Sequence, residues 1–235
     1  MKILNQEAKV FRNDGLRYYL LAYTIFILLG LVVLLTTNYG DVVLFINKYS
    51  RMEWDRAVDW ITRIGLGSTM AIVAVGFALY KLRYSLMMLF NLALVGLVTA
   101  LFKKLLFPDI VRPLKYFDPE AFHRMVQLTD YNLLHSFPSG HTMTIFAMMS
   151  LLAYFSGRNF VAVICVVVAI VVGFSRIYLC QHFFVDVYVG SMLGLICTGT
   201  TIWVGDYAIK LRSKHLFENP FLIRQAKRSF TAFFW

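Results

Sequence analysis

Six stretches of this chain carry no Asp, Glu, Lys or Arg and consist mostly of apolar residues. A helix needs about 20 such residues to cross the hydrocarbon core of a bilayer, and each stretch comes near that length. The pattern predicts an all-α protein, a polytopic membrane helical bundle of about six transmembrane helices. The expected spans are Leu20–Thr37, Ile64–Tyr80, Tyr84–Phe102, Thr142–Gly157, Asn159–Ser175 and Val187–Gly205.

The composition agrees with a membrane protein of one domain. Hydrophobic residues make up 59% of the 235 residues and charged residues only 15%, which leaves too little polar surface for a soluble domain of this length. No polar linker divides the chain, so residues 1–235 are expected to form a single membrane-embedded domain. The three cysteines show no metal-ligand spacing, so we expect neither a bound metal nor a disulfide.

The basic residues predict how the chain lies in the membrane. An even number of spans places both termini on one side, and more than half of the Lys and Arg residues fall on that side, which predicts cytoplasmic termini. These basic flanks, together with a site for an anion, account for the net charge of +10 without a nucleic acid partner. The small size and the lack of an Asn-x-Ser/Thr sequon suggest a bacterial inner membrane, with outward loops facing the periplasm.

The first outward loop, Asp41–Arg63, predicts an amphipathic helix that lies in the membrane interface. Trp54 and Trp60 are expected at the depth of the lipid headgroups. The apolar positions are Trp54, Ala57, Val58 and Ile61, and the polar positions on the other side are Asp55, Arg56, Asp59 and Arg63.

Three polar clusters lie where outward loops meet the predicted spans, and the six-span topology brings all three to one side of the membrane. Their convergence is a stronger signal than any one cluster, because each alone has a simpler explanation as a membrane anchor, a turn or a helix cap. The clusters are Lys103-Lys104 with Arg112-Pro113; Pro138-Ser139-Gly140-His141; and Ser175-Arg176 with His182 and Asp186.

The cationic residues of these clusters predict a phosphate site. Lys104, Arg112 and Arg176 are costly next to hydrocarbon unless an anion pairs with them, and the planar guanidinium group suits phosphate. Ser139 and Gly140 directly precede the fourth span, so the free backbone N–H groups of that helix would face outward toward an anion. Lys103 remains an alternative to Lys104.

Two histidines complete a reaction site that needs no cofactor. His182 and Asp186 are four residues apart and share one face of a helix. A carboxylate that binds one ring nitrogen leaves the lone pair of the other free to attack phosphorus. His141 is placed to protonate the leaving oxygen.

These motifs resemble the type 2 phosphatidic acid phosphatase superfamily, which includes bacterial lipid phosphatases and vanadium haloperoxidases. The match is complete for Pro138-Ser139-Gly140-His141 and for Ser175-Arg176-x5-His182-x3-Asp186, whereas seven rather than the usual six residues separate Lys104 from Arg112. The resemblance implies a phosphohistidine at His182, supported by Asp186, with His141 as general acid. It also implies that Lys104, Arg112, Ser139, Gly140 and Arg176 hold the phosphoryl oxygens.

The expected function is therefore metal-independent hydrolysis of a terminal phosphate from a lipid phosphate or diphosphate. Undecaprenyl diphosphate, lipid A, phosphatidic acid and phosphatidylglycerol phosphate all remain candidate substrates, and Tyr116, Phe117 and Phe122 are candidate contacts for the upper lipid tail. Two alternatives belong to other classes. A transporter or receptor for a phosphorylated ligand needs the cations but not the His182–Asp186 pair, and a vanadate-dependent peroxidase shares the anion site.

Overall fold

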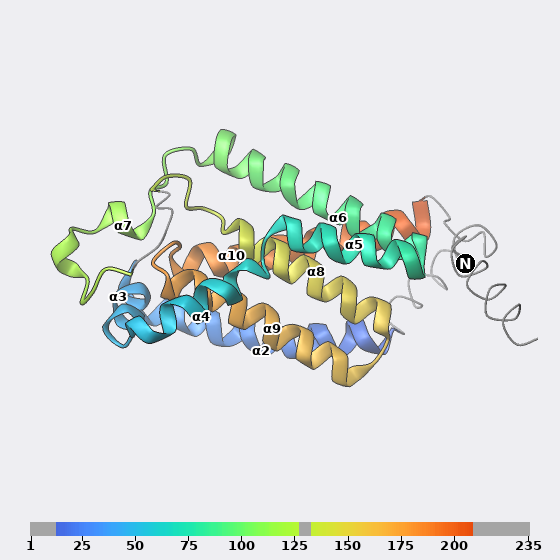
Figure 1. The fold of residues 1–235 in the computed structure, drawn as a ribbon, viewed down its shortest axis with the longest axis horizontal. Helices are drawn as coiled ribbons and strands as arrows, with labels where there is room; N and C mark the ends of the chain where they lie inside the picture. The colour runs from blue at the N-terminus through green and yellow to red at the C-terminus, as the bar shows by residue number, and fades with distance from the viewer. Residues whose placement is uncertain (1–12, 127–132, 209–235) are drawn as a thin grey trace, which may run out of the picture.

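The computed structural model describes residues 13–126 and 133–208, and within these residues it contains helices and no strand (Figure 1). The all-α class is confirmed. The long helices are α2 Asp14–Thr36, α5 Gly67–Tyr80, α6 Leu82–Leu101, α8 Gly140–Ser156, α9 Asn159–Tyr178 and α10 Phe184–Trp203. The short elements are α3 Asp41–Lys48, α4 Met52–Arg63, α7 Pro113–Tyr116, the 3-10 turn η2 Pro119–Ala121, and the π-helical segments η1 Phe102–Leu106 and η3 Val204–Ala208.

Each predicted span coincides with one long helix. Four of these helices in the described part of the chain are long and apolar enough to cross a bilayer: α2, α6 with η1, α9, and α10 with the start of η3. A fifth candidate is the pair α4 and α5, which passes the same test together and is bent by 49° at the break. Helix α8 has 17 residues, and ten of them are buried, which fits a central rather than a lipid-facing helix.

Helix α8 forms the centre of the bundle and packs against α9 and α10, and also against α2, α5 and α6. Its contact with α10 is unusually close because Gly190 and Gly194 of α10 face it. A Cβ atom on Gly194 would lie 2.5 Å from the Met143 carbonyl oxygen, and one on Gly190 would lie 3.0 Å from that of Ser139. Small residues four apart let two membrane helices approach backbone to backbone. This approach places the beginning of α8 beside the beginning of α10.

A buried polar network fixes α6, α8 and α10 relative to one another. Asn91 of α6 donates to the Ala147 carbonyl oxygen at 3.3 Å and to the Thr198 hydroxyl at 3.2 Å, and Ser150 donates to the same hydroxyl at 2.8 Å. Hydrogen bonds between helices in an apolar bundle specify which faces meet, since helices that slipped past one another would leave these groups unpaired.

The amphipathic helix predicted within residues 41–63 is confirmed as α4, but one part of its predicted polar face is wrong. Trp54 and Trp60 are 62% and 64% exposed. Asp55, predicted on the polar side of the helix, is only 8% exposed and binds Arg124, which comes from the loop between α6 and α8. The helical spacing could not show this because the partner is distant in sequence.

The two ends of the bundle differ in structure (Figure 1). At one end α2 begins and α10 finishes, and there Asp206 of η3 accepts hydrogen bonds from Arg83 and Tyr154. At the opposite end lie α3, α4 and α7. The three cysteines are buried and free.

Candidate active site

The loop between α6 and α8 is held over the turn between α9 and α10. Its two limbs pair through the Arg112 N–H to the Leu133 carbonyl oxygen, 3.0 Å, and the Ser136 N–H to the Ile110 carbonyl oxygen, 2.9 Å. Its aromatic side chains pack on Phe183 of the α9–α10 turn, with Tyr116 and Phe117 contacting that ring from two directions. These rings, with Phe122, therefore position the loop, and they lie outside the lining of the cavity described next. Their contact with a lipid tail stays a prediction.

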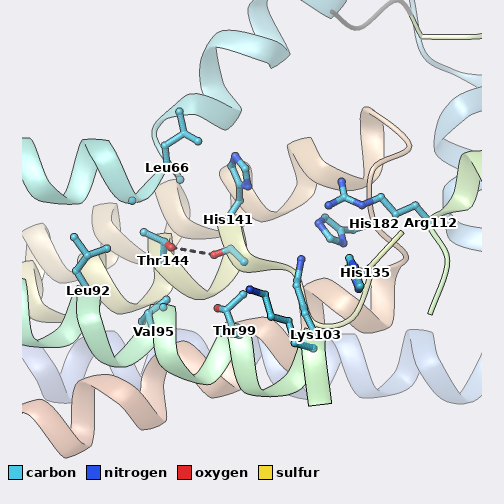
Figure 2. A pocket seen from close by; sticks show the side chains of 16 residues that line it. Leu66, Leu92, Val95, Thr99, Lys103, Arg112, His135, His141, Thr144 and His182 are labelled. Atoms are coloured by element: carbon cyan, nitrogen blue, oxygen red, sulfur yellow. Dashed lines mark hydrogen bonds between the residues drawn. The ribbon is translucent and has the colours of Figure 1, made fainter. Parts of the chain in front are cut away.

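The predicted clusters meet at a cavity of about 540 Å³ that has a polar end and an apolar end (Figure 2). Lys103, Arg112, His135, His141 and His182 surround the polar end. The apolar end lies along α6 and the start of α5. Its lining residues include Leu66, Leu92, Val95, Gly96 and Ala100.

The predicted pair of His182 and Asp186 lies at the polar end. Nδ1 of His182 is 3.3 Å from Oδ2 of Asp186. Because an ionised carboxylate only accepts hydrogen bonds, this contact places the ring proton on Nδ1 and leaves the Nε2 lone pair free. The same Oδ2 accepts from the Ser136 hydroxyl at 2.5 Å and from the Phe183 N–H at 2.9 Å. These bonds fix the carboxylate that orients the imidazole.

The electrostatic surroundings keep His182 neutral. Burial lowers its pKa well below the usual value, and the nearby positive charges of Arg112, Arg176 and Lys103 lower it further. A neutral imidazole carries the lone pair that a nucleophile requires.

The two predicted arginines are buried and bind neutral partners. Arg112, 7% exposed, donates through Nη1 to Gln181 Oε1 at 2.6 Å and through Nε to the Leu134 carbonyl oxygen at 3.1 Å. Burial lowers the pKa of its guanidinium group, and Asp186 partly offsets this effect. Arg176, also 7% exposed, donates to the Thr62 hydroxyl at 2.9 Å, while its Nε is buried without a partner among the described residues. Both cations retain unsatisfied charge near the cavity.

Both candidate lysines line the cavity, but they differ in position. Lys103 is half-buried and its side chain reaches toward the space between His141 and His182 (Figure 2). It interacts electrostatically with Arg112, Asp186 and Arg176. Lys104 is exposed. The π-helical turn η1 spans this pair, and a π-turn rotates the side chains that follow it relative to an α-helix.

The motif at the start of α8 divides its roles. His141 and Gly140 line the cavity, and a Cβ on Gly140 would meet the Thr99 side chain at 3.5 Å. Ser139 is fully buried and caps α8. Its hydroxyl accepts from the Thr142 hydroxyl at 2.9 Å, and its N–H donates to the Asp186 carbonyl oxygen at 3.1 Å. Ser139 thus joins the two halves of the site through its backbone N–H, and its side chain does not line the cavity, unlike its expected place among the phosphate contacts.

Sequence reasoning missed three side chains that hold the site together. Ser136 supports Asp186, Gln181 binds Arg112, and Thr62 binds Arg176. Ser136 and Gln181 each adjoin a motif, which is a usable signal. Thr62 carries none, because it lies on a different helix more than a hundred residues from its partner.

Comparison with known proteins bears on these motifs. The profile of the PAP2 superfamily matches residues 82–210, which includes every predicted site residue from Lys103 to Asp186. The chain belongs to the PAP2 superfamily. No group of three or more His, Cys, Asp or Glu side chains suited to a metal ion occurs among the residues that the structure describes.

Three individual proteins are also similar to this chain. A phosphatidylglycerophosphatase B from Bacillus subtilis (strain 168) is 40% identical over 70 residues, which make up 26% of this chain and 34% of the relative, so the match spans about a third of that protein. The crystal structure of Aquifex aeolicus LpxE superposes with a TM-score of 0.62 at 21% identity, over 70% of this chain and 94% of the other, which shows a common fold. A transmembrane PAP2-type phosphatidylglycerolphosphate phosphatase from Bacillus subtilis gives a TM-score of 0.49 at 22% identity, over 84% of this chain and 98% of the other.

Proposed function

We propose that this PAP2 protein is a membrane lipid phosphatase that removes the terminal phosphate from a lipid phosphate or diphosphate. One observation carries the proposal: His182, oriented by Asp186, lies in one cavity with Lys103 and Arg112, and the arginine is held by neutral partners only in the described residues. Arg176 does not line the cavity, but its positive charge acts on His182. Unpaired cations at membrane depth call for an anionic ligand, and the nucleophile stands where that anion would bind.

The first chemical step is attack of His182 Nε2 on the terminal phosphorus. The bond from phosphorus to the leaving oxygen breaks, and that oxygen takes a proton from His141, so the lipid leaves as an alcohol or a lower phosphate. Lys103, Arg112 and Arg176 stabilise the charge on the phosphoryl oxygens as it shifts in the transition state. We assign this role to Lys103 in preference to Lys104, because Lys103 reaches toward both histidines (Figure 2).

The second step is hydrolysis of the phosphohistidine. Water attacks phosphorus, His141 accepts a proton from the water, and the P–N bond breaks to release inorganic phosphate and restore neutral His182. Asp186 stabilises the imidazolium character that develops in both steps, while Ser136 and the Phe183 N–H hold the carboxylate in place.

The apolar end of the cavity is suited to contact with the lipid tail of the substrate. Leu66, Leu92 and Val95 extend from the histidines along α5 and α6 (Figure 2). Both helices carry exposed apolar residues that suit contact with the bilayer. A headgroup would enter the polar end while its tail stays against this apolar wall.

The proposed location is a bacterial inner membrane, with the site at the periplasmic surface and both termini in the cytoplasm. The support is the distribution of Lys and Arg in the sequence, since basic residues favour the cytoplasmic side. The described chain begins and ends at the end of the bundle opposite the loop with Arg112, as this arrangement requires (Figure 1).

A phosphate-release screen with purified protein in detergent tests the function. The substrates are phosphatidylglycerol phosphate, which the name of the Bacillus relative suggests, and phosphatidic acid, undecaprenyl diphosphate and lipid A. We expect release of inorganic phosphate from at least one lipid without added metal. Absence of release from all of them by folded protein contradicts the proposal and favours a transporter or receptor, and halide oxidation with added vanadate and peroxide identifies a peroxidase.

A further inference from the structure

His135 is a third histidine at the polar end of the cavity, and the mechanism above does not use it. Its Nδ1 is buried and has no hydrogen-bond partner among the described residues. Buried polar atoms of native proteins nearly always have a partner, so an orphan atom on a residue that lines a cavity points to a ligand that supplies one. Its ring lies near Arg112 and Lys103, on the side of the cavity away from His141 (Figure 2).

The backbone of His135 also indicates a fixed position. Its φ angle is +55°, in the left-handed region that only a few per cent of non-glycine residues adopt. The neighbouring residues hold this conformation, because Ser136 is bound through its N–H to Ile110 and through its hydroxyl to Asp186, and Leu134 accepts from Arg112. The imidazole is therefore presented to the cavity by a backbone that cannot relax freely.

The charges around the cavity exceed what one phosphate neutralises. Lys103, Lys104, Arg112 and Arg176 bring four positive charges to the site, and Asp186 is the carboxylate within it. Asp59, which also acts on Arg176, is already paired with Arg63 at 2.8 Å. A terminal phosphate carries about two negative charges at neutral pH, which leaves a surplus of about one positive charge.

We propose that His135 belongs to a second anion subsite, which binds a phosphate group of the substrate other than the one that is hydrolysed. This inference rests on the proposed function and narrows its substrate class to lipids with two phosphates, such as phosphatidylglycerol phosphate or a lipid diphosphate. The Nδ1 of His135 donates a hydrogen bond to the second phosphate, and the surplus positive charge balances it. A substrate with one phosphate leaves this subsite empty.

Binding of two small anions tests the subsite without turnover. Methylenediphosphonate carries two phosphoryl groups that cannot be hydrolysed apart, and orthophosphate carries one. Calorimetric titration of detergent-solubilised protein compares wild type with His135→Gly, which removes the ring and tolerates a positive φ, and with His135→Asn, which keeps a shorter polar group at that angle. The matched control is His123→Gly, because His123 is exposed on the same loop and lies outside the cavity lining.

We expect wild type to bind methylenediphosphonate more tightly than orthophosphate. His135→Gly should weaken the diphosphonate about tenfold, the effect of one hydrogen bond to a charged group, and leave orthophosphate within about twofold. The affinity of His135→Asn for the diphosphonate should fall between those of wild type and His135→Gly. His123→Gly should bind both anions as wild type does. Equal weakening of both anions, or no weakening of either, overturns the second subsite.

Hydrolysis separates this inference from the proposed function. His135→Gly should lower kcat/KM about tenfold for phosphatidylglycerol phosphate. For phosphatidic acid, which expels an alkoxide of the same kind, kcat/KM should stay within about twofold of the wild-type value. If wild type releases phosphate from none of the four lipids of the screen yet prefers the diphosphonate through His135, the proposed function fails and the subsite stands. If it hydrolyses both lipids and His135→Gly affects them equally, the subsite fails and the function stands.

Discussion

Two arginines on the same loop, twelve residues apart, have opposite surroundings. Arg124 donates to both carboxylate oxygens of Asp55, at 2.7 and 2.5 Å, and to the Ser50 hydroxyl at 3.0 Å. Its side chain is 20% exposed and its pKa is raised, chiefly by the hydrogen bonds to Asp55. Arg112 is more deeply buried, binds an amide and a carbonyl oxygen, and has a pKa lowered by burial.

The difference separates structural from functional charge. Arg124 joins the loop between α6 and α8 to α4, and Tyr178 of α9 contacts the same carboxylate at 3.2 Å, so this cluster ties three segments together. A buried cation with its carboxylate in place has little to gain from a ligand. Arg112 lacks such a carboxylate partner in the described chain, and the protein bears the cost of burying its charge. Under the proposed function, the stabilising anion is the substrate.

The largest expected effect is on the nucleophile beside the unpaired cations. His182→Ala should lower kcat on the order of 10⁴-fold or more with every substrate, since each requires the same attacking nitrogen. The cations remain, so the variant should still bind orthophosphate. Turnover kinetics and calorimetry measure the two properties. Activity near that of wild type would exclude His182 as the nucleophile.

The general acid should show a substrate-dependent effect. A lipid monoester expels an alkoxide that needs a proton, whereas an aryl phosphate expels a phenolate that leaves readily without one. His141→Ala should cost on the order of 10²–10⁴-fold with the lipid monoester and much less with the aryl phosphate. The ratio of kcat values for the two substrates is the measurement. The same factor for both would make His141 a phosphate-positioning residue.

Arg112 should matter for activity and hardly for stability. Arg112→Met should lower kcat/KM roughly 10²–10³-fold, because one charged donor to the phosphoryl oxygens is lost. Thermal unfolding in detergent should remain unchanged or shift upward, because an unpaired buried charge is removed. A large fall in stability with little loss of activity would reverse the comparison between the two arginines.

Arg124 should show the opposite pattern. Arg124→Met leaves Asp55 buried without its cation and should destabilise the protein by about 3 kcal/mol, at the lower end for a broken buried pair because the arginine is partly exposed. The folded fraction should keep kcat within about threefold, since Arg124 does not line the cavity. Thermal unfolding and activity corrected for folded protein are the readouts. Loss of kcat in fully folded protein would place Arg124 in the reaction.

The smallest expected effect is that of a chelator. The positive charge comes from side chains, so EDTA should change kcat by no more than about twofold. Vanadate should inhibit, because its five-coordinate form resembles the transition state, and Arg112→Met should weaken that inhibition while Arg124→Met should not. Loss of activity in EDTA with recovery on adding a divalent ion would show a metal requirement.

The fold class and the positions of the long helices follow from local features of the chain. Each apolar block coincides with a helix because the length and composition of a membrane span are properties of one continuous segment. The motifs with His141, His182 and Asp186 were also visible locally. The expectation that His182 and Asp186 share one helix face is wrong, because His182 lies in the turn that precedes α10, yet the short spacing still brings the two side chains together. The structure brings these residues to one cavity, where their catalytic roles remain predictions.

Other features were decided by contacts between segments far apart in the sequence. Asp55 belongs to the polar side of α4 by periodicity, but Arg124 draws it inward. Lys103 and Lys104 are indistinguishable as neighbours, and the π-helical turn, together with the packing of α6 on α8, separates them. Ser136, Gln181 and Thr62 hold the site in shape, yet each meets its partner through the folded chain. Hydrogen bonds act over about 3 Å, so only the packed helices determine which of many possible partners come within reach.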